Sequence, residues 1–177
     1  MLGNITFYPD SVKLFEKRFS KYIGSSNGLM FTNATSALEA AMFAVGVNSK
    51  SRVGTSPFVI PSSYCSAHKL GAQIEFIDVN KYSLNLDYQV LINSEKPRIT
   101  TLIVTHFYGN PCDMRSIMDW ADKHNITVIE DCSHAHGATF GGRMLGSWGH
   151  IAVFSLQGSK AVSAGEGGIA ITNSDRY

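Results

Sequence analysis

Apolar residues recur along the chain at two spacings, one typical of helices and one typical of strands. The helical spacing predicts helices over residues 10–22, 36–46, 62–71 and 111–125, with a shorter helix inside 80–97. Short apolar or alternating runs predict strands over residues 28–32, 72–79, 100–109, 126–131, 149–156 and 167–172, and one more inside 53–64. Helices and strands therefore alternate through most of the chain.

This alternation predicts an α/β fold of three layers, in which helices cover both faces of a mostly parallel central sheet. The apolar run at 100–109 is typical of a strand that is buried on both faces. In such sheets, ligands bind beyond the carboxyl ends of the strands. Three polar clusters follow predicted strands: HFYGN at 106–110, EDCSHAH at 130–136 and SLQGSK at 155–160. We therefore expect the functional site among these clusters.

Composition narrows the classes of protein that the chain can belong to. The 177 residues are 44% hydrophobic, which suffices for one domain with a buried core. The net charge of +1 gives no indication of binding to nucleic acid or to an anionic membrane, and no apolar run is long enough to span a bilayer. The three cysteines lack CxxC spacing, so we expect a protein of a reducing compartment, the cytoplasm.

Two residues in the polar clusters are candidates for catalysis. Lys160 lies among small residues in QGSKAVSAGEGG, where a bulky planar ligand could approach its amine and an aldehyde could bond to it. Asp131 ends an apolar strand and needs a cationic or hydrogen-bonding partner, which a protonated pyridine nitrogen would supply. From these residues alone, an exposed loop lysine and a capping aspartate are the commoner interpretations.

Two further patterns indicate ligand binding. The stretch TNATS, at 32–36, joins a predicted strand to a helix, and the unpaired amides of a helix N-terminus form an anion site. Cys132, His134 and His136 alternate and could ligate zinc. However, the strand stops near Asp131, and only His106 is available as a fourth ligand. We therefore favour histidines that line a pocket and predict no metal.

Four segments together resemble one family. NATSAL, HFYGNPCDM, VIEDCSHAHGA and GSWGHIAVFSLQGSKAVSAGEGG, taken in this order, are similar to the sugar aminotransferases of the DegT/DnrJ/EryC1/StrS type. These enzymes use pyridoxal 5'-phosphate and have the fold of aspartate aminotransferase, called fold type I. The resemblance extends from about Phe15 to the last residue, and it is most specific between residues 128 and 168.

The resemblance implies a role for each matching residue. Lys160 matches the lysine that binds the cofactor covalently and later transfers a proton. Asp131 matches the carboxylate that keeps the pyridine nitrogen protonated, so that the ring can accept electrons. Thr35 and Ser36 match the turn that holds the cofactor phosphate.

Two further positions and one departure complete the implied site. Ser155 matches another phosphate ligand, and His134 occupies a position beside the ring hydroxyl. Cys132 and His136 are interpreted as packing residues. Relatives carry an aromatic residue that stacks on the ring in the segment matching PSSYCSA; here Cys65 aligns with it and Tyr64 is adjacent. Ala34 replaces a common glycine.

The resemblance also implies a function and an assembly. The expected reaction transfers an amino group from glutamate or glutamine to a nucleotide-linked keto-sugar, in a homodimer. Residues 1–177 are expected to be the cofactor-binding large domain, incomplete at both ends and without the smaller C-terminal domain. The alternative is a non-catalytic remnant that keeps the fold. A zinc hydrolase leaves Lys160 unexplained, and a dehydratase of this family would carry histidine in its place.

Overall fold

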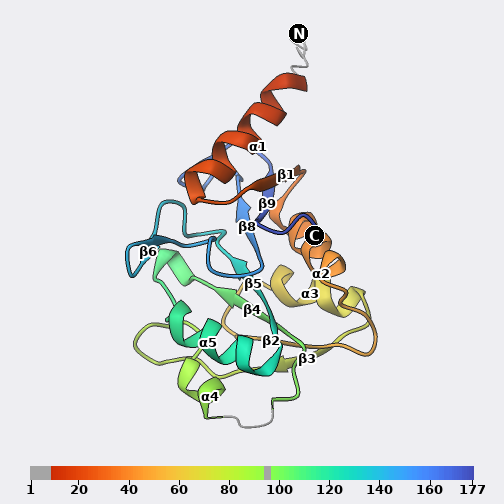
Figure 1. Cartoon of the computed structure of the whole chain (residues 1–177), viewed down its shortest axis with the longest axis vertical. Coiled ribbons are helices and arrows are strands. Elements are labelled where there is room, and N and C mark those ends of the chain that lie inside the picture. Colours follow the sequence, from red (N-terminus) through yellow and green to blue (C-terminus); the bar gives the residue numbers. More distant parts are fainter. Residues whose placement is uncertain (1–8, 94–96) are drawn as a thin grey trace.

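The computed structural model describes residues 9–93 and 97–177, and its centre is a seven-stranded sheet (Figure 1). The strand order is β1-β9-β8-β5-β4-β2-β3. The pairs from β8 to β3 are parallel, and β9 runs antiparallel to both of its neighbours. The strands are β1 (Asn27–Phe31), β2 (Arg52–Thr55), β3 (Gln73–Phe76), β4 (Thr101–Thr105), β5 (Thr127–Asp131), β8 (Ile151–Ser155) and β9 (Gly168–Thr172).

Helices cover both faces of the sheet, which makes three layers. One face packs against α2 (Ala34–Ala44) and α3 (Ser62–Lys69). The other packs against α1 (Pro9–Ile23), α4 (Tyr88–Ile92) and α5 (Met114–His124). The prediction of a three-layer α/β fold with a mostly parallel sheet is confirmed.

Side chains of the central strand β5 alternate between the two faces. Ile129 packs in the core beneath α2 and α3, whereas Val128 packs in the core beneath α1, α4 and α5. The two acids that end β5 follow the same alternation, so Glu130 and Asp131 point to opposite faces. This separation gives the two neighbouring carboxylates different environments.

Several element boundaries differ from the predictions. The helix predicted from residue 111 begins at Met114, because Asp113 accepts a hydrogen bond from the Ser116 amide as its N-cap. The strand predicted inside 53–64 ends at Thr55, before the first of its prolines. The strand predicted to reach residue 109 ends at Thr105, and a 3₁₀ turn (Phe107–Gly109) follows. A small hairpin, β6 (Thr139–Phe140) with β7 (Arg143–Met144), was not predicted.

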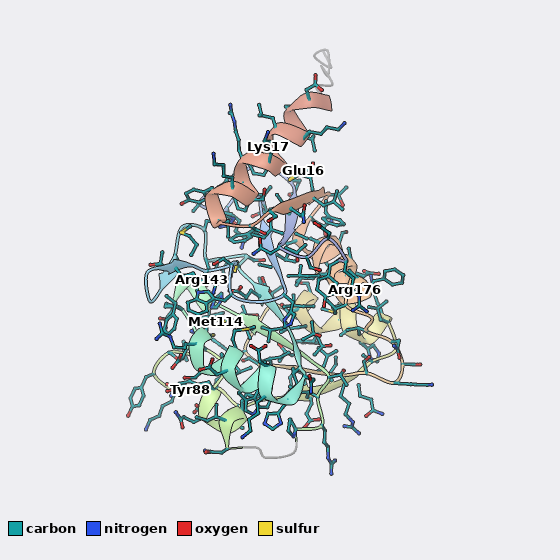
Figure 2. The ribbon with its side chains drawn as sticks, viewed as in Figure 1. Glu16, Lys17, Tyr88, Met114, Arg143 and Arg176 are labelled. Carbon is teal, nitrogen blue, oxygen red and sulfur yellow. The ribbon has the colours of Figure 1, made fainter. Side chains whose placement is uncertain are left out.

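Helix α1 lies at one end of the long axis of the molecule and α4 at the other (Figure 1). Figure 2 shows Glu16 on α1 close to β1, where its carboxylate accepts a hydrogen bond of 2.8 Å from the Met30 amide. This bond attaches α1 to the outermost strand of the sheet. Across residues 9–93 and 97–177, none of the helices combines the length and the apolar character that crossing a membrane requires.

Candidate active site

The carboxyl ends of β4, β5 and β8 meet at one edge of the sheet. Thr105 pairs with Asp131, and Asp131 pairs with Val153 in the register of these parallel strands. Each strand is followed by one of the polar clusters that the sequence indicates. The topology therefore brings the three clusters together, as expected for a parallel sheet.

Asp131 is held by two hydrogen bonds on the face covered by α3. Its Oδ2 accepts from the Ser63 hydroxyl at 2.8 Å, and its Oδ1 accepts from the Ser133 amide at 3.1 Å. Only 5% of the residue is exposed. Because a carboxylate has about four acceptor positions, Asp131 retains capacity for a donor from a ligand.

Two adjoining cavities open beside this aspartate. The smaller, about 30 Å³, is lined by Ile60, Ser62, Thr105, Phe107, Asp131, Ser133 and His134. The larger, about 420 Å³, is lined by Tyr108, Ser133, His134, His136, Ser159, Lys160 and Ala161. Ser133 and His134 belong to both linings, so the cavity beside Asp131 adjoins the cavity that Lys160 lines, with His134 between them.

The environment of Lys160 favours a neutral amine. Burial lowers the pKa of Lys160 from its usual 10.5, and the negative charge of Asp131 opposes this effect. Burial also lowers the pKa of His134, and the positive charge of Lys160 acts in the same direction. A lowered lysine pKa makes the neutral amine, the form that attacks a carbonyl, more accessible than in a solvent-exposed lysine.

The N-terminus of α2 approaches the same edge of the sheet. Asn33 caps α2 by accepting from the Ser36 amide at 2.8 Å, while the amides of Ala34 and Thr35 have no partner among the described residues. Ala34 has an ordinary helical backbone, so its replacement of a glycine introduces no strain. Two unpaired amides at a helix N-terminus attract an anion.

Gly168 brings the end of β8 next to this helix N-terminus. It pairs with Ser155 across β8 and β9, and a Cβ on Gly168 would lie 2.5 Å from the Ala34 nitrogen. Ser155, at the end of β8, therefore lies near the start of α2, which carries Thr35 and Ser36. The absence of a side chain at residue 168 is what permits the approach.

Gly168→Ala is expected to displace the start of α2 and to lower the free energy of unfolding by about 1–3 kcal/mol. The reason is that the added methyl group meets backbone atoms of Asn33 and Ala34, which cannot rotate away. Gly158→Ala is the matched control, because the nearest atom to its Cβ would be 3.6 Å away. Urea unfolding measures both changes. Equal stability of the two variants would contradict the expected close contact.

The structure does not bring Tyr64 and Cys65 to the two cavities. Ser63, Ser66 and Ala67 form the buried face of α3, so that Tyr64 turns aside and packs edge-on against Phe76. Cys65 is exposed. Ser62 of this segment and the preceding Ile60 line the smaller cavity beside Asp131 instead. The prediction that Tyr64 or Cys65 contacts a cofactor ring therefore gains no support from their positions.

Cys132, His134 and His136 do not converge on one metal position. Cys132 is buried on the opposite face, where its sulfur lies near His106 and Glu130. Burial raises the pKa of the Cys132 thiol, with the negative charge of Glu130 as a further cause, so the thiolate that binds metals is disfavoured. His134 instead faces the cavity with Lys160.

His136, which the sequence suggests as a packing residue, has two roles in the structure. Its ring packs against Phe154, with 5.4 Å between centroids, and it also lines the larger cavity. Burial lowers its pKa from the usual 6.5, a hydrogen bond to the backbone of Ser155 opposes this, and the charge of Lys160 lowers it further. A neutral imidazole therefore lies beside Lys160.

The lowered pKa of His136 predicts a stability that falls in mild acid. As pH falls through 6.5, His136 becomes protonated in the unfolded chain before it does so in the folded chain. The unfolded state then binds more protons, so the free energy of unfolding decreases as pH falls. His136→Gln is expected to weaken this dependence, whereas the exposed His68→Gln serves as the control. Thermal unfolding from about pH 7.5 to about pH 5.5, an interval that brackets the usual histidine pKa, measures this pH dependence of stability. An unchanged slope in His136→Gln would contradict the assignment.

Solved structures of known proteins show which class of protein has this fold. The fold matches the solved structure of an aminotransferase from Psychrobacter cryohalolentis, with a TM-score of 0.90 and 34% identity over 94% of this chain and 42% of that one. It also matches 3-amino-5-hydroxybenzoic acid synthase, with a TM-score of 0.88 and 32% identity over 94% of this chain and 43% of that one. The described residues thus have a fold that forms part of solved aminotransferase structures.

Residues 3–177 match the sequence profile of the DegT/DnrJ/EryC1/StrS aminotransferase family, and the chain belongs to this family. Among its relatives, GDP-perosamine synthase of Caulobacter vibrioides is 37% identical over 161 residues, covering 91% of this chain and 43% of the relative. The spore coat polysaccharide biosynthesis protein SpsC of Bacillus subtilis is 34% identical, covering 93% and 42%. The chain thus spans less than half the length of these relatives.

Members of this family use pyridoxal phosphate, and the residues at the site fit this cofactor. Thr105 Oγ1 and His134 Nδ1 are buried, line the smaller cavity with Asp131 and have no hydrogen-bond partner among the described residues. Such orphaned polar atoms are costly unless a ligand supplies the partner. The unpaired amides of α2 suit a phosphate.

Proposed function

We propose that the protein is a pyridoxal-phosphate-dependent aminotransferase that transfers an amino group to a nucleotide-linked keto-sugar. The observation that carries this proposal is that Lys160 and Asp131 line adjoining cavities, close enough for the charge of Asp131 to act on the Lys160 amine, on the fold of this family. The names of the relatives, which include GDP-perosamine synthase and a transaminase for a dTDP-linked amino sugar, support a sugar substrate. The product would enter a polysaccharide or a secondary metabolite.

Each residue of the site has a proposed part. When bound, the cofactor supplies an aldehyde that reacts with amines and a ring that accepts electrons. Lys160 holds the cofactor and moves a proton at its Nζ. Asp131 holds a proton on the ring nitrogen, and Ser63 orients that carboxylate. His134 donates or accepts at the ring hydroxyl.

The phosphate of the cofactor is proposed to bind where α2 begins. The amides of Ala34 and Thr35 at the start of α2, together with the hydroxyls of Thr35, Ser36 and Ser155, are the groups proposed to hold it. A helix N-terminus together with hydroxyl groups is a general arrangement for phosphate binding. No step of the reaction occurs at these residues; they fix the cofactor relative to Lys160.

We further propose that the protein forms a homodimer in the cytoplasm and takes its amino group from glutamate or glutamine. Exposed apolar side chains near the edge of the sheet, Leu29 on β1 and Phe43 on α2, support association. The three cysteines are free, which suits a reducing compartment. Analytical ultracentrifugation tests the dimer, and a monomer at micromolar concentration would contradict it.

Two measurements on the protein as its gene encodes it test the proposed function. Borohydride reduction after addition of pyridoxal phosphate is expected to leave the cofactor on the peptide that contains Lys160. Single-turnover assays with glutamate or glutamine, then with nucleotide-linked keto-sugars, test the two half-reactions separately. Labelling at another lysine would refute the site. A folded, labelled protein that turns over neither substrate would favour the non-catalytic alternative.

A further inference from the structure

The loop after β4 carries a residue in a conformation that its type rarely adopts. Tyr108 has φ 49° and ψ 29°, in the left-handed region. Such a conformation costs energy in a residue with a Cβ, and it persists only where the surroundings enforce it. The described residues include two other non-glycine residues with positive φ, Leu84 and Asn125, and neither lines the cavity of Lys160.

Two neighbours enforce this conformation. Asn85 is 4% exposed, and its side chain accepts from the Phe107 amide at 3.0 Å and donates to the Asn110 carbonyl at 2.9 Å. It therefore clamps the loop on both sides of Tyr108. The next residue, Gly109, also has positive φ, and a Cβ there would lie 3.1 Å from the His134 carbonyl oxygen. The loop is thus pressed against the segment that carries His134.

The clamped loop presents the tyrosine ring to the cavity. One face of the ring stacks on the imidazole of His134, with 5.2 Å between centroids and 20° between planes. The residue is nevertheless 80% exposed, and it lines the larger cavity together with Lys160. Burial of apolar surface therefore does not offset the backbone strain, because most of the side chain remains in water. A strained, exposed aromatic residue at a cavity points to contact with a ligand.

The chemistry of the ring identifies the part of the substrate that it fits. Phe107 packs edge-on against Tyr108, with 4.6 Å between centroids, and Phe58 packs on Phe107 at 4.7 Å. These rings make an apolar wall that ends in one phenolic hydroxyl. A hexose presents C–H groups on the faces of its ring and hydroxyls at its edge, so it matches both parts of this wall. A nucleotide phosphate would need cations, and among the described residues that line the larger cavity only Lys160 is a lysine or an arginine.

We propose, on the basis of the proposed function, that Tyr108 is the residue that positions the hexose ring of the substrate, packing against it with the face opposite His134. Asn85 is the residue that maintains this position through its two hydrogen bonds to the loop. These hydrogen bonds and the close approach of Gly109 to His134 keep the ring in place before the sugar arrives, so that binding the sugar does not have to order the loop.

Tyr108→Asn is the informative variant, because asparagine tolerates the left-handed conformation while it lacks the ring. It is expected to weaken binding of the sugar about tenfold, the scale of one lost aromatic contact. Tyr108→Phe keeps the ring and is expected to restore most of the affinity. Tyr82→Asn is the matched control, since Tyr82 is 83% exposed and is not part of the lining of this cavity.

Two measurements on the protein with pyridoxal phosphate bound separate the possible outcomes. The first is calorimetric affinity for dTDP-glucose and GDP-mannose, stable probes that require no turnover. The second is the KM for the keto-sugar compared with the rate of the amino-donor half-reaction. We expect Tyr108→Asn to lose affinity and raise KM, with a much smaller effect on the donor half-reaction and an unchanged absorbance spectrum of the cofactor.

Three results would overturn the proposal: unchanged affinity for both probes, equal losses in the two half-reactions, or a shift in sedimentation without loss of affinity. The last would make Tyr108 a subunit contact. A wild-type protein that binds the probes through Tyr108 but shows no turnover would refute the proposed function and leave the sugar contact standing. A wild-type protein that binds neither probe would refute the sugar contact, whatever its activity with amino donors.

Discussion

Replacing Lys160 with alanine is expected to lower the rate of amino transfer by roughly 10³-fold or more, because the change removes both the nucleophile and the group that moves the proton. Stability should change by no more than about 0.5 kcal/mol. The side chain of Lys160 makes no hydrogen bond or ion pair with the described residues, so the fold does not depend on it. Single-turnover kinetics and thermal unfolding of the same preparation measure the two effects.

Two control variants make this result specific. Lys160→Arg keeps the positive charge but cannot act as a nucleophile, so it is expected to remain inactive. Lys69→Ala removes an exposed lysine that pairs with Glu39 at 3.2 Å, and its activity should stay near that of the wild type. Substantial transfer by Lys160→Ala would mean that another amine carries the reaction.

The order of helices and strands was predictable from the sequence because each element has a clear spacing of apolar residues. The run TLIVT, for example, is apolar enough to be a strand buried on both faces, and it forms β4 in the middle of the sheet. Boundaries were less predictable, since they depend on caps and turns such as Asp113 before α5. The pairing order of β9 between β1 and β8 has no local signal in the sequence.

The expectation for the site rests on position and resemblance, and its outcome differs among the residues. Asp131, His134 and Lys160 line two adjoining cavities because parallel strands end at one edge. Tyr64 was chosen because it is aromatic, but the small residues Ser63, Ser66 and Ala67 define the buried face of α3 and turn Tyr64 away. Their spacing of three and four residues was the signal that would have indicated this orientation.

Tyr108 illustrates what a sequence does not reveal. The dipeptide Tyr108-Gly109 predicts a turn, but it does not indicate which residues of the turn take the left-handed conformation. That conformation depends on Asn85, 23 positions earlier, and on the close approach of Gly109 to His134. Such long-range contacts are visible only once the chain is folded.

The neighbour of Asp131 has a different and purely structural importance. Glu130 is fully buried on the opposite face of β5. Its Oε1 accepts from the amides of Trp148 and Gly149 at 2.7 and 2.6 Å. Its Oε2 accepts from the Gly146 amide at 2.8 Å and lies 3.1 Å from His106 Nε2. The carboxylate thus holds the segment that leads into β8.

His106 takes part in this arrangement in one tautomer. The Cys112 amide donates to its Nδ1 at 3.2 Å, so the ring proton lies on Nε2 and points to Glu130. The Glu130 carboxylate is therefore the hydrogen-bond acceptor for four donors: three backbone amides and His106 Nε2. The amides of Gly146, Trp148 and Gly149 have no other acceptor among the described residues, which makes the carboxylate difficult to replace.

Glu130→Ala is expected to lower the free energy of unfolding by about 3–5 kcal/mol, because it leaves three backbone amides and His106 without their acceptor in a buried site. Glu130→Gln should lower the free energy of unfolding less than Glu130→Ala. It still destabilises the protein, because the glutamine NH2 group would face at least one of the donors that now bind the carboxylate.

Glu75→Ala is the control. It removes a half-exposed carboxylate that lies 3.5 Å from Arg52 on the edge of the sheet, and its effect should stay below about 1 kcal/mol. Urea unfolding followed by tryptophan fluorescence measures all three variants. A loss of less than about 1 kcal/mol in Glu130→Ala would show that the 146–149 segment finds other acceptors, such as water, and that β8 does not depend on this carboxylate.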